Sequence, residues 1–261
     1  MSVDLSHITV AADLKNSVAE LGQYKDQFGK PISFPVPGWE PARSVERKVL
    51  HGRLCRVEPI ELERHARSLF EANSLDPQGT NWTYLSYGPC PTWESYTAWM
   101  TQVCLGDDPL FFAIVDNATE RAIGVASYLR IVPVHGLIEV GHINYSPLLQ
   151  RTTMATEAMH LMMKHVFELG YRRYEWKCDA LNAQSRTSAQ RLGFSYEGVF
   201  RQAMVYKDRN RDSAWYSALD REWPELDRAF SHWLDPSNFD EQGKQRIKLG
   251  ELTGPLLERR G

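Results

Sequence analysis

Several features that would point to particular classes of protein are scarce or missing in this sequence. It has four cysteines, and they form no C-x-x-C pair, so neither a zinc site nor a dense disulfide framework is predicted. No apolar run approaches the length of a membrane span. The first residues are partly acidic and lack the long apolar core of a secretory signal. We therefore expect a cytoplasmic protein with reduced thiols, no bound metal and no membrane partner.

An excess of charge of one sign is also missing. The chain has 30 Lys and Arg against 33 Asp and Glu, with a formal net charge of −3 at pH 7. Nucleic-acid-binding domains usually carry a basic stripe, so no nucleic-acid partner is expected. The 261 residues, of which 43% are hydrophobic, are enough for one large domain with a sizeable core.

The spacing of apolar residues predicts an α/β domain at 49–235, between an N-terminal arm at 1–48 and a C-terminal tail at 236–261. Strands are predicted at 53–60, 110–116, 122–132, 136–147, 174–181, 198–206 and 213–219. Helices are predicted at 61–72, 92–104, 152–169, 182–192 and 223–234. Glycine and asparagine interrupt the strand at 136–147, which indicates a bulge or a close backbone approach.

The start of the helix at 152–169 is a candidate phosphate site. The first turn of a helix has unpaired N–H groups and a partial positive charge, which suit a pyrophosphate. The side chains around this turn supply hydroxyl groups, a positive charge and a small side chain that would also favour phosphate binding. The residues of the candidate site are Gln150, Arg151, Thr152, Thr153, Met154, Ala155 and Thr156. The alternative is that the threonines only cap the helix.

This junction resembles that of the GNAT superfamily of N-acetyltransferases, whose signature is Gln/Arg-x-x-Gly-x-Gly/Ala. Gln150 and Ala155 fit the first and last positions, and Thr153 replaces the central glycine. The resemblance, over about residues 50–220, implies a central mixed, mostly antiparallel sheet with helices on both faces. Its fourth and fifth strands would splay apart around the pantetheine arm of acetyl-CoA, the expected co-substrate.

A second motif resembles the RimJ/RimL-type branch of the same superfamily. It runs Asn182-x-x-Ser185-x-x-Ser188-Ala189-x-Arg191-x-Gly193-Phe194 and is followed by Glu197-Gly198. The resemblance implies that Ile143, Asn144 and Tyr145 contact the acetyl and pantetheine groups, and that Asn182 bonds the arm. Asn182 is also a natural helix N-cap.

The same resemblance assigns an acid to protonate the departing thiolate. Ala189 stands where many relatives have a tyrosine, whereas Ser185 matches the serine that RimL-type enzymes use. Ser185 could equally be purely structural, in the first turn of its helix.

The base that takes the proton of the amine is left open by the sequence. Met204 occupies the position of the RimL-type glutamate and cannot take a proton. Glu139 and His142 are our candidates, with Asp179 or a water relay as alternatives. Glu139 and His142 are three positions apart on a strand, so their side chains should point to opposite faces unless a bulge intervenes.

The last prediction concerns the acceptor. Aromatic side chains that could wall its pocket, or belong to the core, are Trp82, Tyr84, Tyr87 and Trp176. We expect acetyl transfer to a primary amine of a small molecule. The alternatives are acetylation of a protein N-terminus, and binding of coenzyme A without turnover. The chain would be a monomer or a homodimer.

Overall fold

The computed structural model describes residues 23–261, and its centre is an eight-stranded sheet in the order β3-β4-β5-β6-β7-β8-β10-β9. Neighbouring strands are antiparallel except for β7 and β8, which are parallel. The strands are β3 (Leu50–His51), β4 (Cys55–Pro59), β5 (Leu110–Asp116), β6 (Ala122–Val132), β7 (Leu137–Tyr145), β8 (Arg173–Asp179), β9 (Ser195–Tyr206) and β10 (Arg209–Leu219). The predicted mixed, mostly antiparallel sheet is confirmed.

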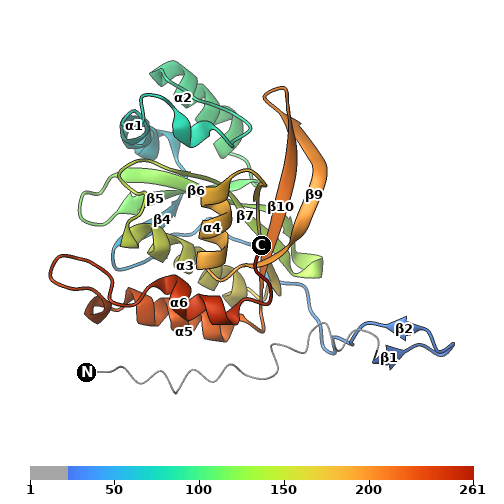
Figure 1. Ribbon diagram of the computed structural model, residues 1–261. Coiled ribbons are helices and arrows are strands. Elements are labelled where there is room, and N and C mark those ends of the chain that lie inside the picture. The colour runs from blue at the N-terminus through green and yellow to red at the C-terminus, as the bar shows by residue number, and fades with distance from the viewer. Residues whose placement is uncertain (1–22) are drawn as a thin grey trace.

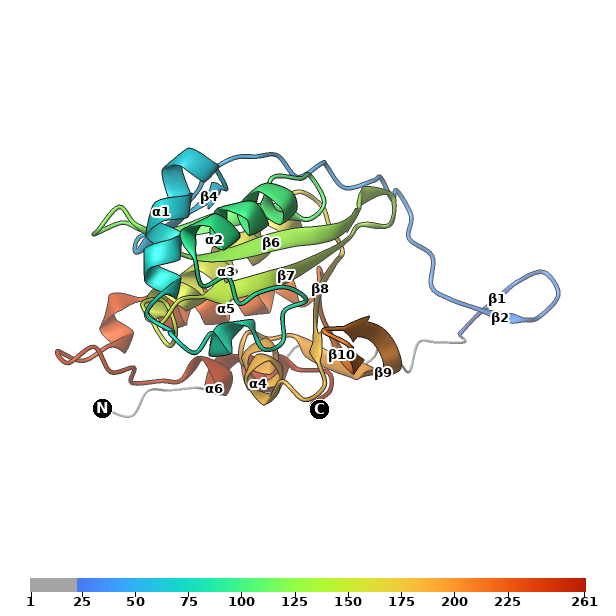
Figure 2. The same ribbon diagram turned by 90° about the horizontal axis from the view of Figure 1, so that it is seen from above.

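Helices cover both faces of this sheet, as predicted. One face is covered by the first two helices and the other by α3, α5 and α6 (Figures 1 and 2). The helices are α1 (Leu62–Asn73), α2 (Trp93–Trp99), α3 (Thr153–Glu168), α4 (Ala183–Arg191), α5 (Trp223–Leu234) and α6 (Leu249–Thr253). A π-helical turn, Met100–Cys104, extends α2. Short 3-10 turns lie at Thr80–Trp82, Pro133–His135, Pro236–Asn238 and Gly254–Leu256. Across residues 23–261, no helix combines the length and the apolar character needed to cross a membrane.

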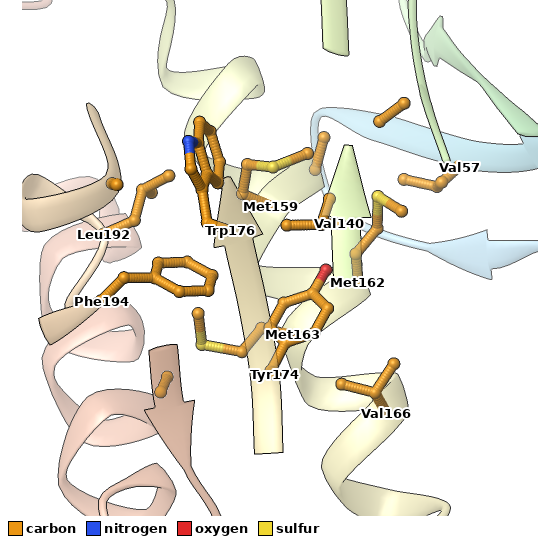
Figure 3. Packing of buried hydrophobic residues seen from close by; sticks show 14 of the residues in the cluster. Val57, Val140, Met159, Met162, Met163, Val166, Tyr174, Trp176, Leu192 and Phe194 are labelled. Carbon is orange, nitrogen blue, oxygen red and sulfur yellow. The ribbon is translucent and has the colours of Figure 1, made fainter. Parts of the chain in front are cut away.

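The larger core lies between the sheet and α3. Figure 3 shows Met159, Met162 and Met163 of α3 beside Tyr174 and Trp176 of β8. All five side chains are buried, and each apolar side chain of this size contributes roughly 1.5–3 kcal/mol when removed from water. This packing fixes α3 against β8, and it thereby fixes where the first turn of α3 meets the end of β7.

A second, aromatic core lies under α1 and α2. The ring of Trp99 packs edge-on against Trp82 at 5.1 Å and against Tyr96 at 5.2 Å between centroids. Phe111 of β5 lies at 6.4 Å from Trp99 on the sheet side. These contacts hold the loop that follows residue 79 against the sheet, next to β7.

The regions predicted as an arm and a tail contain structure that periodicity did not predict. Residues 1–22 of the arm lie outside the described part, whereas β1 (Tyr24–Lys25) and β2 (Pro31–Ile32) form a hairpin that projects from the body (Figure 1). At the other end, residues 236–261 fold back onto α4 and α5 through the buried side chains of Leu249, Leu252 and Leu256.

Candidate active site

A cleft of about 530 Å³ opens where β7 and β8 separate. The two strands pair only between Leu137–Val140 and Arg173–Trp176. Beyond this point β7 continues to pair with β6, and β8 continues to pair with β10. The predicted splaying of the fourth and fifth domain strands is confirmed, and it leaves the β8-facing edge of the β7 backbone without a strand partner.

A bulge in β7 gives the cleft two side chains where regular alternation would give one. The register with β6 shifts between Val125 and Ser127, and His142 has a φ of 50°. As a result, Glu139 and His142 both line the cleft although they are three positions apart. The bulge predicted from the glycines and asparagine of this strand accounts for the arrangement.

His142 lines the cleft and lies between aromatic rings. Its ring is stacked on Tyr87, with 5.7 Å between centroids, and is 5.1 Å from Phe111. Nδ1 of His142 is 2.8 Å from the Tyr87 hydroxyl. Burial, followed by the positive charges of Arg130 and Arg211, lowers the pKa of His142 to about 4. The imidazole is therefore neutral at pH 7, and Nε2 is the ring nitrogen left for a ligand.

Glu139, the other predicted base, is held in a buried ionic network. Its carboxylate pairs with Arg130 and with Nζ of Lys177, which is 2.8 Å away. Lys177 also pairs with Glu175 at 2.7 Å and lies over the ring of Trp215 at 3.7 Å. The side chains of Glu139, Glu175 and Lys177 are 3–7% exposed, so this network is shielded from solvent screening.

The network continues across the sheet beyond Lys177. Arg173 pairs with Glu175 at 2.7 Å and with Glu197 at 2.6 Å, and Ser217 donates to Glu197 at 2.7 Å. Opposite charges thus alternate over side chains of β6, β7, β8 and β9, and Ser217 comes from β10, which lies between β8 and β9. Among residues 23–261, no group of three His, Cys, Asp or Glu side chains could hold a metal ion.

The predicted acid, Ser185, lies in the first turn of α4 and lines the cleft. Its Oγ accepts a hydrogen bond of 3.0 Å from Nε1 of Trp176, which leaves the hydroxyl hydrogen available to a ligand. Asn182 caps the helix because its Oδ1 accepts from the Ser185 N–H at 3.0 Å. The amide nitrogen of Asn182 remains at the cleft, so the capping and binding roles are compatible.

Asp179, the alternative base, also lines the cleft, and its two carboxylate oxygens are engaged. One accepts from the Tyr206 hydroxyl at 2.8 Å, and the other accepts from the Leu181 N–H at 2.8 Å. Burial and the bond to Asp179 raise the pKa of Tyr206 to about 12. Asp179 thus fixes the turn after β8 and ties it to the β9–β10 hairpin.

The predicted phosphate site has the local geometry of a capped helix start. Thr152 is the N-cap of α3 and accepts from the Ala155 N–H at 3.1 Å. The N–H groups of Thr153 and Met154 in this first turn have no intrahelical acceptor. Arg151 turns the chain into the helix with a φ of 60°.

Thr156, the last residue predicted for the phosphate site, lies in α3 away from the cleft lining. It is buried, and its hydroxyl accepts from Arg191 at 3.1 Å. Its contact is therefore with α4 rather than with the cleft.

The other predicted cofactor residues are divided between the cleft and the core. Ile143 and Gln150 line the cleft, whereas both ends of the buried Asn144 amide lack a hydrogen-bond partner among the described residues. The carbonyl of Tyr145 accepts from Gln150 at 2.8 Å and from Asn81 at 3.1 Å. The bond from Asn81 joins the loop before α2 to the end of β7.

The four aromatic side chains that were predicted to wall the acceptor pocket differ in their distance from the cleft. Tyr84 and Trp176 line the cleft. Tyr87 contacts it only through His142, and Trp82 is buried in the aromatic core.

Three further lining residues, Arg130, Lys177 and Arg211, were not predicted from the sequence. One available signal was the run of charged residues at every second position of β8, Arg173, Glu175, Lys177 and Asp179.

Comparisons with known proteins agree with this geometry. A family model described as an acetyltransferase (GNAT) domain matches residues 55–195. A solved structure of a GCN5-related N-acetyltransferase from Brucella melitensis is 44% identical and covers 84% of this chain and 100% of its own, with a TM-score of 0.82. A GNAT-family structure from Chromobacterium violaceum ATCC 12472 is 39% identical and covers 74% and 97%, with a TM-score of 0.70.

A more distant structure shares the fold alone. It is a RimL ribosomal L7/L12 alpha-N-protein acetyltransferase in complex with coenzyme A, and it is 17% identical with a TM-score of 0.53 over 66% of this chain and 98% of its own. No curated protein sequence matches the chain. The family match and the two closely similar structures establish that the chain belongs to the GNAT family and is an acyl-CoA-dependent acetyltransferase.

Proposed function

We propose that this acetyltransferase moves an acetyl group from acetyl-CoA to the primary amine of a small molecule. The observation that carries the small-molecule assignment is a pair of hydrogen bonds that link the elements bordering the cleft. Lys207, at the tip of the β9–β10 hairpin, donates to the carbonyl of Trp82 at 2.7 Å, and the Tyr84 hydroxyl donates to the carbonyl of Leu181 at 3.3 Å. These bonds link the loop before α2 to the hairpin and to the start of α4.

A cleft whose borders are linked in this way favours a compact acceptor. A peptide N-terminus must enter with its chain trailing out, and it therefore needs an open groove. Here the two cross-links and the side chains of Thr83, Tyr84 and Ser86 border the cleft. This arrangement supports a small molecule over a protein N-terminus.

The residues present fit acetyl-CoA at the other half of the cleft. The N–H groups of Thr153 and Met154 suit the pyrophosphate. The unpaired edge of β7 beyond Val140 and the amide of Asn182 suit the polar groups of the pantetheine arm. When bound there, acetyl-CoA would supply the thioester that the amine attacks.

Two side chains are proposed to handle protons. His142 would accept the proton of the amine through Nε2, directly or through a water, in the neutral tautomer whose Nδ1–H donates to the Tyr87 hydroxyl. Glu139 would instead position Arg130 and Lys177, which already engage its carboxylate. Ser185 would donate its hydroxyl hydrogen to the departing thiolate.

The test is release of thiol from acetyl-CoA, followed with a panel of amino acids, polyamines, aryl amines and short peptides. Turnover of one class of small amine at least ten times faster than of any peptide is expected. Faster turnover of peptides would replace the proposal by N-terminal acetylation. A His142→Asn variant should lose activity at saturating acceptor, and unchanged activity would remove His142 as the base.

A further inference from the structure

Two arginines from different strands face the cleft near His142. Arg130 of β6 and Arg211 of β10 both line it. The charge of each lowers the pKa of His142, so both guanidinium groups lie close enough to act on the imidazole. The cleft therefore has a positive pole at the end where the proposed proton acceptor lies.

Arg130 is held by an unusual backbone conformation. Its φ is 49°, a left-handed value that costs energy for a residue with a side chain. The Asp108 carboxylate supports this bend by accepting from the N–H groups of Arg130 at 2.9 Å and Ile131 at 3.1 Å. The side chain pairs with Glu139 and is still 50% exposed. A fixed bend that directs a half-exposed arginine along the cleft fits a binding role.

Arg211 has a different environment. Its Nε donates to Ser213 at 3.0 Å, which orients the guanidinium plane. Among the residues of 23–261, no carboxylate lies within ion-pair distance of it. Its two terminal nitrogens can therefore bind the two oxygens of a carboxylate from a ligand.

The remaining charges of the cleft do not neutralise this pole. The negative groups that line it are Glu139 and Asp179. Asp108, which does not line it, also acts on His142, and its carboxylate is engaged by two backbone N–H groups. Glu139 is engaged by Arg130 and Lys177, and Asp179 by the Tyr206 hydroxyl and the Leu181 N–H. A polyamine would place further positive charge next to the unpaired guanidinium of Arg211, whereas an anionic group would compensate the charge of this guanidinium.

We propose that the acceptor carries a carboxylate as well as its amine, and that Arg211, assisted by Arg130, binds this carboxylate. The inference rests on the proposed function and narrows it to amino-acid-like acceptors. Binding of the carboxylate would also offset the positive charges that act on His142, so the imidazole would become more basic when the acceptor arrives.

The test uses pairs of acceptors that differ in one charge. Short ω-amino acids and α-amino acids are each compared with their primary amides, and tetrapeptides beginning with Asp are compared with those beginning with Asn. We expect kcat/KM to be at least tenfold higher for the free carboxylates than for their amides. Preference for the Asp peptides over every free amino acid would place the carboxylate on a peptide and overturn the amino-acid assignment.

The variants separate recognition from structure. Arg211→Gln should raise KM for the carboxylate acceptors at least tenfold while changing KM for the amides and for acetyl-CoA far less. Arg211→Lys, which keeps the charge without the fork, should recover part of the loss. Arg209→Gln, at an exposed position of the same strand, is the control and should behave as the wild type.

Three results would overturn the inference: equal use of carboxylates and amides, an equal loss for all acceptors, or a rise in KM for acetyl-CoA alone. Titration of the complex with coenzyme A by a carboxylate acceptor distinguishes the two proposals. Arg211-dependent binding without turnover of any amine would contradict the proposed transfer and support the carboxylate site. Absence of both binding and turnover would overturn both.

Discussion

The cleft has two halves that are built by different means. The half at the turn before α3 and at the start of α4 is lined by uncharged side chains, which include Gln150, Asn182 and Ser185. The half contributed by β6, β7, β8 and β10 holds all the charged lining residues, which are Arg130, Glu139, Lys177, Asp179 and Arg211.

The difference indicates how co-substrate binding and acceptor recognition would be divided between the two halves. Helix starts offer N–H groups and a partial positive charge that need no ionisable side chain, so they suit a phosphate-bearing co-substrate at any pH. Charged side chains on strands can pair with one another while one charged group is left unpaired for a ligand. The strand half is therefore where acceptor preference and proton transfer would be set.

The largest effect is expected from breaking the ionic network of the strand half. Lys177→Met removes the ammonium between Glu139 and Glu175, two buried carboxylates that are in register on neighbouring strands. Removing one partner from a buried network costs roughly 3–5 kcal/mol of unfolding free energy. Denaturant unfolding measures this change.

The matched control for Lys177 is a lysine on the surface. Lys164 pairs with Glu168 at 4.0 Å on α3, and its side chain is 48% exposed. Lys164→Met should change the unfolding free energy by less than about 1 kcal/mol. Equal losses in the two variants would mean that the network of the strand half contributes no special stability.

A smaller effect, on rate, is expected at the start of α4. Ser185→Ala should lower kcat at saturating acceptor by roughly a hundredfold or more, because a general acid typically contributes about 10²–10⁴-fold to the rate. An acetyl donor with a more acidic thiol should reduce the loss, since its thiolate needs less help to depart. Ser188→Ala, exposed on the same helix, is the control. A fall of less than twofold in Ser185→Ala would rule Ser185 out as the acid.

A further substitution tests the neutral half of the cleft by adding a charge to it. Thr153→Glu places a carboxylate at the first position of α3, where it should weaken binding of coenzyme A by about tenfold or more through repulsion of the phosphates. Folding should not suffer, because an acidic residue favours a helix start. Thr153→Gln is the neutral control, and calorimetric titration gives both affinities. Equal affinities would place the phosphates elsewhere.

The fold could be predicted from the sequence because its signals are local. The strands Leu110–Asp116 and Ala122–Val132 and the helix Trp223–Leu234 have the bounds that periodicity predicts. The short α6 could not be predicted in this way, because five residues are too few to establish a helical period.

The charged half of the site could be predicted only in part. Glu139 and His142 were both candidates, and a bulge was the stated condition under which the two side chains could share a face. The burial of Lys177 depends on Glu139, which comes from another strand and lies in register with Glu175. Arg130 faces the cleft because of a backbone bend that Asp108 supports from a distant loop. Such pairings depend on tertiary contacts, and local spacing does not reveal them.

The smallest expected effect tests whether the charges of the strand half act on His142. Burial is the first cause of its lowered pKa and Arg130 the second, so Arg130→Gln should raise this pKa above about 4 while leaving it below the ordinary value of about 6.5. NMR titration of the imidazole, assigned with His142→Asn, measures the shift. Arg121→Gln, at the start of β6 and paired with Glu71, should leave it unchanged.

The same substitution has a predicted effect on the pH profile. Protonated His142 cannot accept a proton, so kcat/KM falls as the pH drops through the pKa of the free enzyme. A raised pKa in Arg130→Gln therefore moves the acid limb to higher pH, and the variant loses activity at a pH where the wild type retains it. A shifted NMR titration with an unmoved acid limb would show that the charges of the strand half reach His142 but that another group takes the proton.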